Sequence, residues 1–205
     1  MCIRDSIEAL KPLLGDDIAG MMMTNPNTLG LFEYDIPEIA ELIHACGGLM
    51  YYDGANMNPM LGKCRPGDMG FDVVHLNLHK TFSTPHGGGG PGVGPICVAE
   101  HLVPFLPGHE LFGNATNQVA GAPFGSAGIL PITYGYIRMM GTEGLTRATK
   151  IAILNANYLA ACFKDTYGIV YRGATGFVGH EMILECRKVH EETGISENDI
   201  AKRLM

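Results

Sequence analysis

The chain has 205 residues, 46% of them hydrophobic and 17% charged, which is typical of a globular protein with one sizeable core or one domain and part of another. A formal net charge of −7 and the absence of tryptophan argue against a nucleic-acid partner, and no window reaches the roughly 18–20 apolar residues of a membrane helix. The six cysteines form no C-x-x-C pair, so we expect reduced thiols in a cytoplasmic compartment, with neither a nucleic-acid nor a membrane partner.

The first part of the chain predicts a strand, a helix and a second strand. An apolar run over 18–23 stops at a turn of polar residues and proline, which is typical of a buried strand. Residues 35–46 place proline and glutamate in a first helical turn and repeat apolar residues at helical spacing. Another apolar run follows over 49–52. This order indicates a parallel strand pair in an α/β sheet.

The rest of the chain alternates short extended and helical patterns. Residues 104–128 are rich in glycine, proline and asparagine and are expected to form loops, and residues 196–199 resemble a helix capping box. The remaining patterns predict strands over 71–78, 92–98 and 182–186 and helices over 131–140 and 142–163.

Polar residues follow three of these strands, where ligands bind in α/β sheets. Lys80 lies where an apolar strand meets a glycine-rich loop, so its amine can be partly desolvated and can attack a carbonyl, as in a Schiff base. Asp53, after the neighbouring strand, is a candidate acid for the pyridine nitrogen of pyridoxal phosphate. A lone lysine at a strand end is usually only solvated, and aspartate before glycine is usually a turn residue. Together, Lys80 and Asp53 indicate a pyridoxal-phosphate site more specifically than either residue alone. The polar strand ends expected to lie together are Thr24–Asn25, Asp53–Ala55 and Asn77–Lys80.

The sequence offers weaker support for two other kinds of site, a nucleotide-binding loop and a metal centre. The glycine run at 87–94 is neither a P-loop nor a dinucleotide fingerprint and is expected to allow close backbone approach around a cofactor. His75 and His79 on one extended strand would lie roughly 13 Å apart, too far to share an ion, so we expect no metal. His79 is expected either to contact cofactor or substrate or to be structural.

Several long stretches resemble the glycine-cleavage P-protein family, the pyridoxal-phosphate glycine decarboxylases. The resemblance extends from about residue 7 to residue 203. The stretches that carry it are TNPNTLGLFE (24–33), YDGANMN (52–58), DVVHLNLHKTF (72–82), PHGGGGPG (85–92), GSAGIL (125–130), YIRMMG (136–141) and AILNANY (152–158).

The resemblance implies a fold and a set of site residues. The fold would be that of fold-type-I pyridoxal-phosphate transferases, similar to aspartate aminotransferase. Residues 1–128 would form the C-terminal part of the large, cofactor-binding domain, and residues 129–205 the start of a smaller α+β domain. Lys80 would carry the Schiff base, Asp53 would face the pyridine nitrogen and Ala55 the ring. The other residues expected around the cofactor are Thr24, Asn25, Asn77 and His79.

The implied reaction removes CO2 from glycine and transfers the aminomethyl group to the lipoyl arm of the H-protein. The partners would be glycine, the lipoylated H-protein and the other P-protein subunit or half, in the cytoplasm or, for a eukaryotic fused form, the mitochondrial matrix. The chain would be an internal fragment that is inactive and poorly stable alone.

Two alternatives stay open at this point. An aminotransferase or another amino-acid decarboxylase would use a similar site, and an aminotransferase usually needs an arginine for the substrate carboxylate, for which Arg172 and Arg187 are candidates. A non-catalytic assembly subunit could keep the fold, but it would need neither Lys80 nor Asp53.

Overall fold

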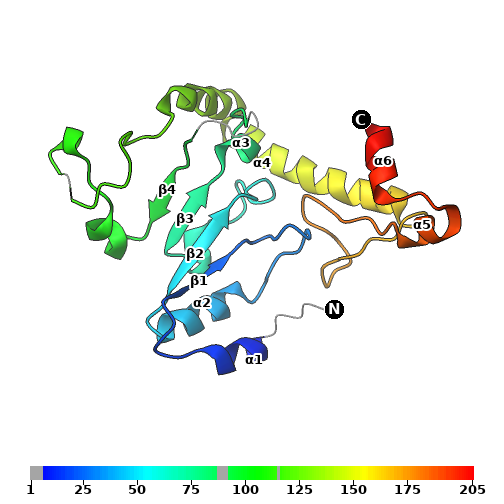
Figure 1. Cartoon of the computed structure of the whole chain (residues 1–205), viewed down its shortest axis with the longest axis horizontal. Coiled ribbons are helices and arrows are strands. Elements are labelled where there is room, and N and C mark those ends of the chain that lie inside the picture. The colour runs from blue at the N-terminus through cyan, green and yellow to red at the C-terminus, as the bar shows by residue number, and fades with distance from the viewer. Residues whose placement is uncertain (1–6, 87–91, 115) are drawn as a thin grey trace.

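A four-stranded mixed sheet forms the centre of the chain in the computed structural model, which describes residues 7–86, 92–114 and 116–205. The strands are β1 (Gly20–Met23), β2 (Leu49–Gly54), β3 (Val73–Leu76) and β4 (Ile96–Val98). They lie in the order β1-β2-β3-β4, with β1, β2 and β3 parallel and β4 antiparallel to β3 (Figure 1). The predicted parallel pair is confirmed, and the carboxyl ends of three strands therefore share one edge.

Helix α2 (Ile36–Ala45) packs its apolar face on this sheet. It buries Ile39 and Ile43 against Met50 and Tyr52 of β2, while Leu42 is partly buried at the same cluster. Each fully buried side chain of this size stabilises the fold by about 1.5–3 kcal/mol.

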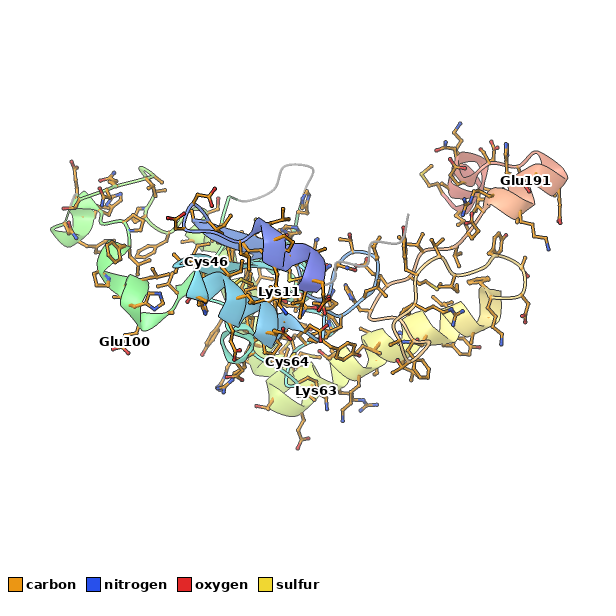
Figure 2. The ribbon with its side chains drawn as sticks, turned by 90° about the horizontal axis from the view of Figure 1, so that it is seen from below. Lys11, Cys46, Lys63, Cys64, Glu100 and Glu191 are labelled. Atoms are coloured by element: carbon orange, nitrogen blue, oxygen red, sulfur yellow. The ribbon has the colours of Figure 1, made fainter. Side chains whose placement is uncertain are left out.

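Two short helical turns precede the sheet, α1 (Ile7–Leu10) and the 3₁₀ turn η1 (Lys11–Leu13). Figure 2 shows them beside α2, with Lys11 labelled at their junction. The Lys11 ammonium lies 3.5 Å from the carboxylate of Glu38 in α2. Both side chains are about half exposed, so this ion pair adds little stability.

The third predicted strand is shorter than expected. β3 ends at Leu76, and residues 78–81 turn into a short helix, α3 (Leu78–Thr81), so Lys80 lies in a helical turn rather than directly on a strand end. The turn forms because Leu78 is buried and its carbonyl oxygen accepts hydrogen bonds from the backbone N–H groups of Phe82 and Thr84. The predicted glycine run lies largely outside the described residues.

Loops with short 3₁₀ turns separate the sheet from the C-terminal helices, as the composition of 104–128 predicts. These turns are η3 (Glu100–Phe105), η4 (Glu110–Phe112) and η5 (Ala127–Ile129). A further 3₁₀ turn, η2 (Pro66–Met69), lies between β2 and β3.

A long helix, α4 (Leu130–Phe163), runs from the sheet towards the C-terminal elements (Figure 1). Gly141 interrupts it with φ 60° and ψ −177°, so the two helices predicted on either side of this residue are present. The hydroxyl of Thr133 donates to the carbonyl of Phe82 at 3.1 Å, and the buried hydroxyl of Thr149 donates to that of Asn58 at 2.7 Å. These bonds tie α4 to the segments that follow β3 and β2.

The chain ends in two short helices beyond the far end of α4, α5 (Arg187–Thr193) and α6 (Glu197–Leu204). The predicted capping box is confirmed, since Ser196 and Asp199 exchange side-chain and backbone hydrogen bonds. The predicted strand over 182–186 is wrong in extent, because only an isolated bridge between Ile169 and Leu184 forms. The expected domain boundary at 128/129 stays a prediction.

Several large apolar side chains remain exposed. Met22 of β1 is 61% exposed, and no strand of the described residues pairs with the outer edge of β1. The low stability and inactivity expected for the isolated chain stay predictions. Among the described helices, none is both long and apolar enough to cross a membrane.

Candidate functional site

The register of β2 and β3 places Asp53 directly beside His75 at the carboxyl end of the sheet. The Nε2 atom of His75 lies 3.1 Å from Oδ1 of Asp53, and both side chains are about three-quarters buried. A close backbone approach holds this register, because a Cβ atom on Gly54 would lie 1.8 Å from the carbonyl oxygen of His75. Only glycine therefore fits there without moving β2 away from β3.

The Asp53 carboxylate is held from further sides. The hydroxyl of Thr24 donates to Oδ2 at 3.1 Å, and the backbone N–H of Ala55 donates to Oδ1 at 3.0 Å. The structure thus brings together three of the residues predicted from the strand ends. These contacts orient the carboxylate at the sheet edge while a quarter of the side chain stays exposed.

A tyrosine extends the network behind Asp53. The hydroxyl of Tyr51 lies 3.0 Å from Nδ1 of His75. All the contacts are satisfied when Tyr51 donates to Nδ1 and the Nε2–H of His75 donates to Asp53. The sequence predicts neither residue as part of the site. His75 could have been found from the pairing of β2 with β3, because their register places it opposite Asp53.

Lys80 leaves the same edge of the sheet through Asn77 and α3. Its side chain is exposed, and no hydrogen bond or ion pair of its ammonium is found within the described ranges. The ring of the adjacent His79 packs edge-on against His86, with ring centroids 4.6 Å apart. Partial burial, His86 and Lys80 together lower the pKa of His79. Asp53 and the turn that carries His79 and Lys80 thus both follow strands at the carboxyl end of the sheet.

The two predicted asparagines differ in their surroundings. The Asn25 side chain is fully buried and is bonded to Glu33, accepting from its N–H at 2.9 Å and donating to its carbonyl at 3.0 Å. It holds the loop between β1 and α2, and its expected cofactor contact stays a prediction. Asn77 precedes α3 without capping it, so its half-buried amide makes no capping bond.

A segment distant in sequence packs against the loops of this edge. The chain between α4 and α5 runs back towards the sheet (Figure 1), where the N–H of Gly179 donates to the carbonyl of Gly30 at 2.7 Å. The amide of Asn56 lies 3.5 Å from the carboxylate of Glu181. The side chain of the neighbouring His180 is 9% exposed. Burial lowers its pKa, Glu181 opposes this effect, and the charge of Lys80 adds to it. Sequence reasoning missed these residues.

The described residues contain neither a disulfide nor a cluster of metal ligands. The cysteines at 46, 64, 97, 162 and 186 are all unpaired thiols. In the part of the chain that the structure describes, no group of three or more histidine, cysteine, aspartate or glutamate side chains could hold a metal ion.

The sequence is similar to curated glycine dehydrogenases. The family described as "Glycine dehydrogenase, C-terminal domain" matches residues 148–205. Glycine dehydrogenase (decarboxylating) from Bacteroides thetaiotaomicron is 80% identical over 188 residues, which cover 92% of this chain and 20% of that protein. The mitochondrial enzyme of the same name from Dictyostelium discoideum is 55% identical over 194 residues, again 92% of this chain and 20% of that protein.

Solved structures with the same fold include a glycine decarboxylase (P-protein) of the glycine cleavage system, with a TM-score of 0.67 and 21% identity over 80% of this chain and 42% of that one. An alanine–glyoxylate aminotransferase from Nostoc has a TM-score of 0.67 and 17% identity over 97% of this chain and 53% of that one. At such identities the likeness shows the fold alone, and this fold is a partial fold-type-I architecture, as the sequence predicts.

The chain spans about a fifth of the length of the curated relatives that it matches. Its high identity to them extends over nearly all of its own residues. Along nearly all of its length, the chain is therefore similar to one segment of the proteins named glycine dehydrogenase (decarboxylating).

Proposed function

We propose that the full-length protein containing this segment decarboxylates glycine with pyridoxal phosphate and passes the aminomethyl group to a lipoylated H-protein. The observation that carries the proposal is 80% identity to a glycine dehydrogenase (decarboxylating) along a segment that contains both Lys80 and Asp53. A non-catalytic assembly subunit would have no need of either Lys80 or Asp53.

The residues at the sheet edge fit the cofactor. Asp53 presents a carboxylate that is fixed by Thr24, Ala55 and His75 yet remains partly exposed. Lys80 presents an amine from α3, the short helix that follows the adjacent strand β3. We assign Lys80 as the covalent anchor, Asp53 as the partner of the ring nitrogen, and Thr24 and His75 as the groups that orient Asp53. Ala55, Asn77 and His79 are proposed to line the same pocket.

When bound, pyridoxal phosphate supplies an electron sink for the carbanion that forms as CO2 leaves. The protein's contribution is charge and orientation. Asp53 supplies a fixed negative charge to the edge where the ring nitrogen would bind, and this charge needs no reorganisation during the reaction. Tyr51 and His75 support Asp53 from behind, since their two bonds fix the imidazole in one orientation.

The proposed partners follow from the same assignment. They are glycine, the lipoyl arm of the H-protein and the remainder of the P-protein, whether in the same polypeptide or a second subunit. For a bacterial protein of this type we propose a cytoplasmic location.

A chimaeric enzyme tests the proposed function. In this chimaera, called the test enzyme below, the present chain replaces the matching segment of the Bacteroides thetaiotaomicron relative. With pyridoxal phosphate and lipoylated H-protein, we expect it to exchange labelled bicarbonate into the carboxyl group of glycine. The unaltered relative is the positive control. If the control exchanges label and a folded, cofactor-loaded test enzyme does not, the proposal is wrong.

The same assay separates decarboxylation from transamination. The two arginines considered for binding a transaminase substrate already have partners. Arg172 donates to the carbonyl of Gly176 at 3.1 Å, and the exposed Arg187 forms an ion pair with Glu185. This pairing lowers the pKa of Glu185 to about 2. We therefore expect no amino transfer from glycine to a 2-oxo acid.

Gly54→Ala is expected to destabilise the site. The added Cβ would meet the His75 carbonyl at 1.8 Å, so β2 and β3 must separate where they hold Asp53 and His75. Overpacking of this kind costs about 1–3 kcal/mol, which we expect as a lower melting midpoint of the test enzyme together with weaker cofactor retention. Gly67→Ala is the control, because a Cβ there meets nothing within 4 Å. Equal melting midpoints for the two variants would contradict the close approach.

A further inference from the structure

Tyr51, His75 and Asp53 form a continuous row of side chains on one face of the sheet. Tyr51 and Asp53 are two residues apart on β2, so their side chains lie on the same face, and the register sets His75 of β3 beside Asp53. The Tyr51 hydroxyl lies 3.0 Å from Nδ1 of the imidazole, and Oδ1 of Asp53 lies 3.1 Å from Nε2. Both ring nitrogens of His75 therefore have a partner.

His75 contributes more to Asp53 than orientation. The Thr24 hydroxyl and the Ala55 N–H already hold the two carboxylate oxygens, each at about 3 Å. The contribution of His75 depends on where its hydrogen lies. An Nε2–H donates to Oδ1, whereas a lone pair on Nε2 would repel the carboxylate unless Asp53 took up a proton. The tautomer of His75 therefore decides whether Asp53 keeps its negative charge.

The hydroxyl of Tyr51 selects this tautomer. A neutral imidazole has one hydrogen, so a donor at Nδ1 leaves that hydrogen on Nε2. Within the described ranges, Tyr51 and Asp53 are the ionisable groups bonded to His75. The neighbouring strands add no charge there, because β4 sets Ile96 opposite His75 and the end of β1 supplies the hydroxyl of Thr24.

We propose that Tyr51 fixes the hydrogen of His75 on Nε2, so that Asp53 stays ionised and holds a proton on the ring nitrogen of the cofactor. Tyr51 is then a positioning residue, which acts on the ring nitrogen through His75 and Asp53. The inference deepens the proposed function and rests on it in taking Asp53 as the partner of that nitrogen. The contacts that carry it are present in the cofactor-free structure.

Nuclear magnetic resonance of pyridoxal phosphate labelled with ¹⁵N at its ring nitrogen measures this proton without turnover. The loaded test enzyme is titrated with base, and the ¹⁵N shift gives the pH at which the proton leaves. We expect Tyr51→Phe to lower this pH by about one unit, a tenfold loss of proton affinity, because the donor to Asp53 is no longer fixed. Tyr158→Phe, at an exposed tyrosine of α4, is the control and should titrate as the parent does.

A His75→Gln background separates this role from packing. The amide nitrogen of glutamine can donate to Asp53 without a second partner, so it needs no tyrosine to select a tautomer. We therefore expect Tyr51→Phe to shift the titration in the parent but not in His75→Gln. A tyrosine that served only to pack would give the same shift in both backgrounds. That result, or no shift in either background, would overturn the inference.

Asp53→Asn shows which proposal has failed. If this variant leaves the titration unchanged, the assignment of Asp53 is wrong and the inference falls with it. If Asp53→Asn releases the proton at a lower pH and Tyr51→Phe does not, only the role of Tyr51 is wrong. If Tyr51→Phe does not retain the cofactor, ¹⁵N-histidine spectra of the parent decide, with the His75 signals identified by their loss in His75→Gln. A hydrogen on Nε2 alone supports the inference, and a hydrogen on Nδ1 overturns it.

Discussion

Lys80→Ala is expected to reduce the exchange of bicarbonate with glycine to the level measured without enzyme. Alanine has no amine, so the cofactor cannot be anchored covalently in α3, and the absorption band of the anchored cofactor should disappear. Because Lys80 is exposed and makes no bond seen in the described structure, the variant should fold as the parent does. Circular dichroism and the melting midpoint of the test enzyme check that point.

Two further variants show whether covalent bonding or charge is lost. Lys80→Arg keeps the positive charge but cannot form the bond, so we expect it to be as inactive as the alanine variant. Lys63→Ala removes another exposed lysine, labelled in Figure 2, and should leave exchange unchanged. Appreciable exchange by Lys80→Arg would show that Lys80 acts only through its charge.

Asp53→Asn is expected to slow exchange by about 10²–10³-fold while the cofactor stays anchored to Lys80. Asparagine has nearly the same shape and can still accept from the Ala55 N–H, but it carries no negative charge for the ring nitrogen. Losses of this size are typical when one preorganised electrostatic partner is removed from an active site. The measurements are the exchange rate and the absorption spectrum of the test enzyme.

Two control variants test whether the effect of Asp53→Asn comes from the lost charge at this position. Asp68→Asn changes an aspartate that is paired with Arg65 on the surface and should leave exchange unchanged. Thr24→Ala removes one donor to Asp53 and leaves the charge, so its effect should be smaller than that of Asp53→Asn. If Asp53→Asn exchanged label as fast as the parent, Asp53 would not be the partner of the ring nitrogen.

Local sequence patterns were sufficient to predict the sheet edge. The runs that form β1, β2 and β3 are apolar, and each is followed by polar residues. Parallel pairing alone then brings Thr24 to Asp53, which the structure confirms at 3.1 Å. The α4 interruption was also predictable, because Gly141 adopts a positive φ that few other residues tolerate.

The missed residues depend on contacts that no local pattern encodes. His75 becomes part of the site through its register with Asp53, and a shift of one residue would turn it to the other face. His180 comes from a loop about a hundred residues after Lys80, and its burial depends on Asn157 and Gly30. The alternation over 182–186 was misleading, because strand pairing needs a partner and only Leu184 forms a bridge.

Borohydride trapping of the loaded test enzyme tests the central claim most directly. Reduction makes a covalent link between pyridoxal phosphate and a lysine permanent, so peptide mass spectrometry can locate it. We expect one phosphopyridoxyl group per site, on Lys80, and less of it when an excess of glycine has displaced the lysine before reduction. A modified lysine other than Lys80 would contradict the assignment of this sheet edge as the cofactor site.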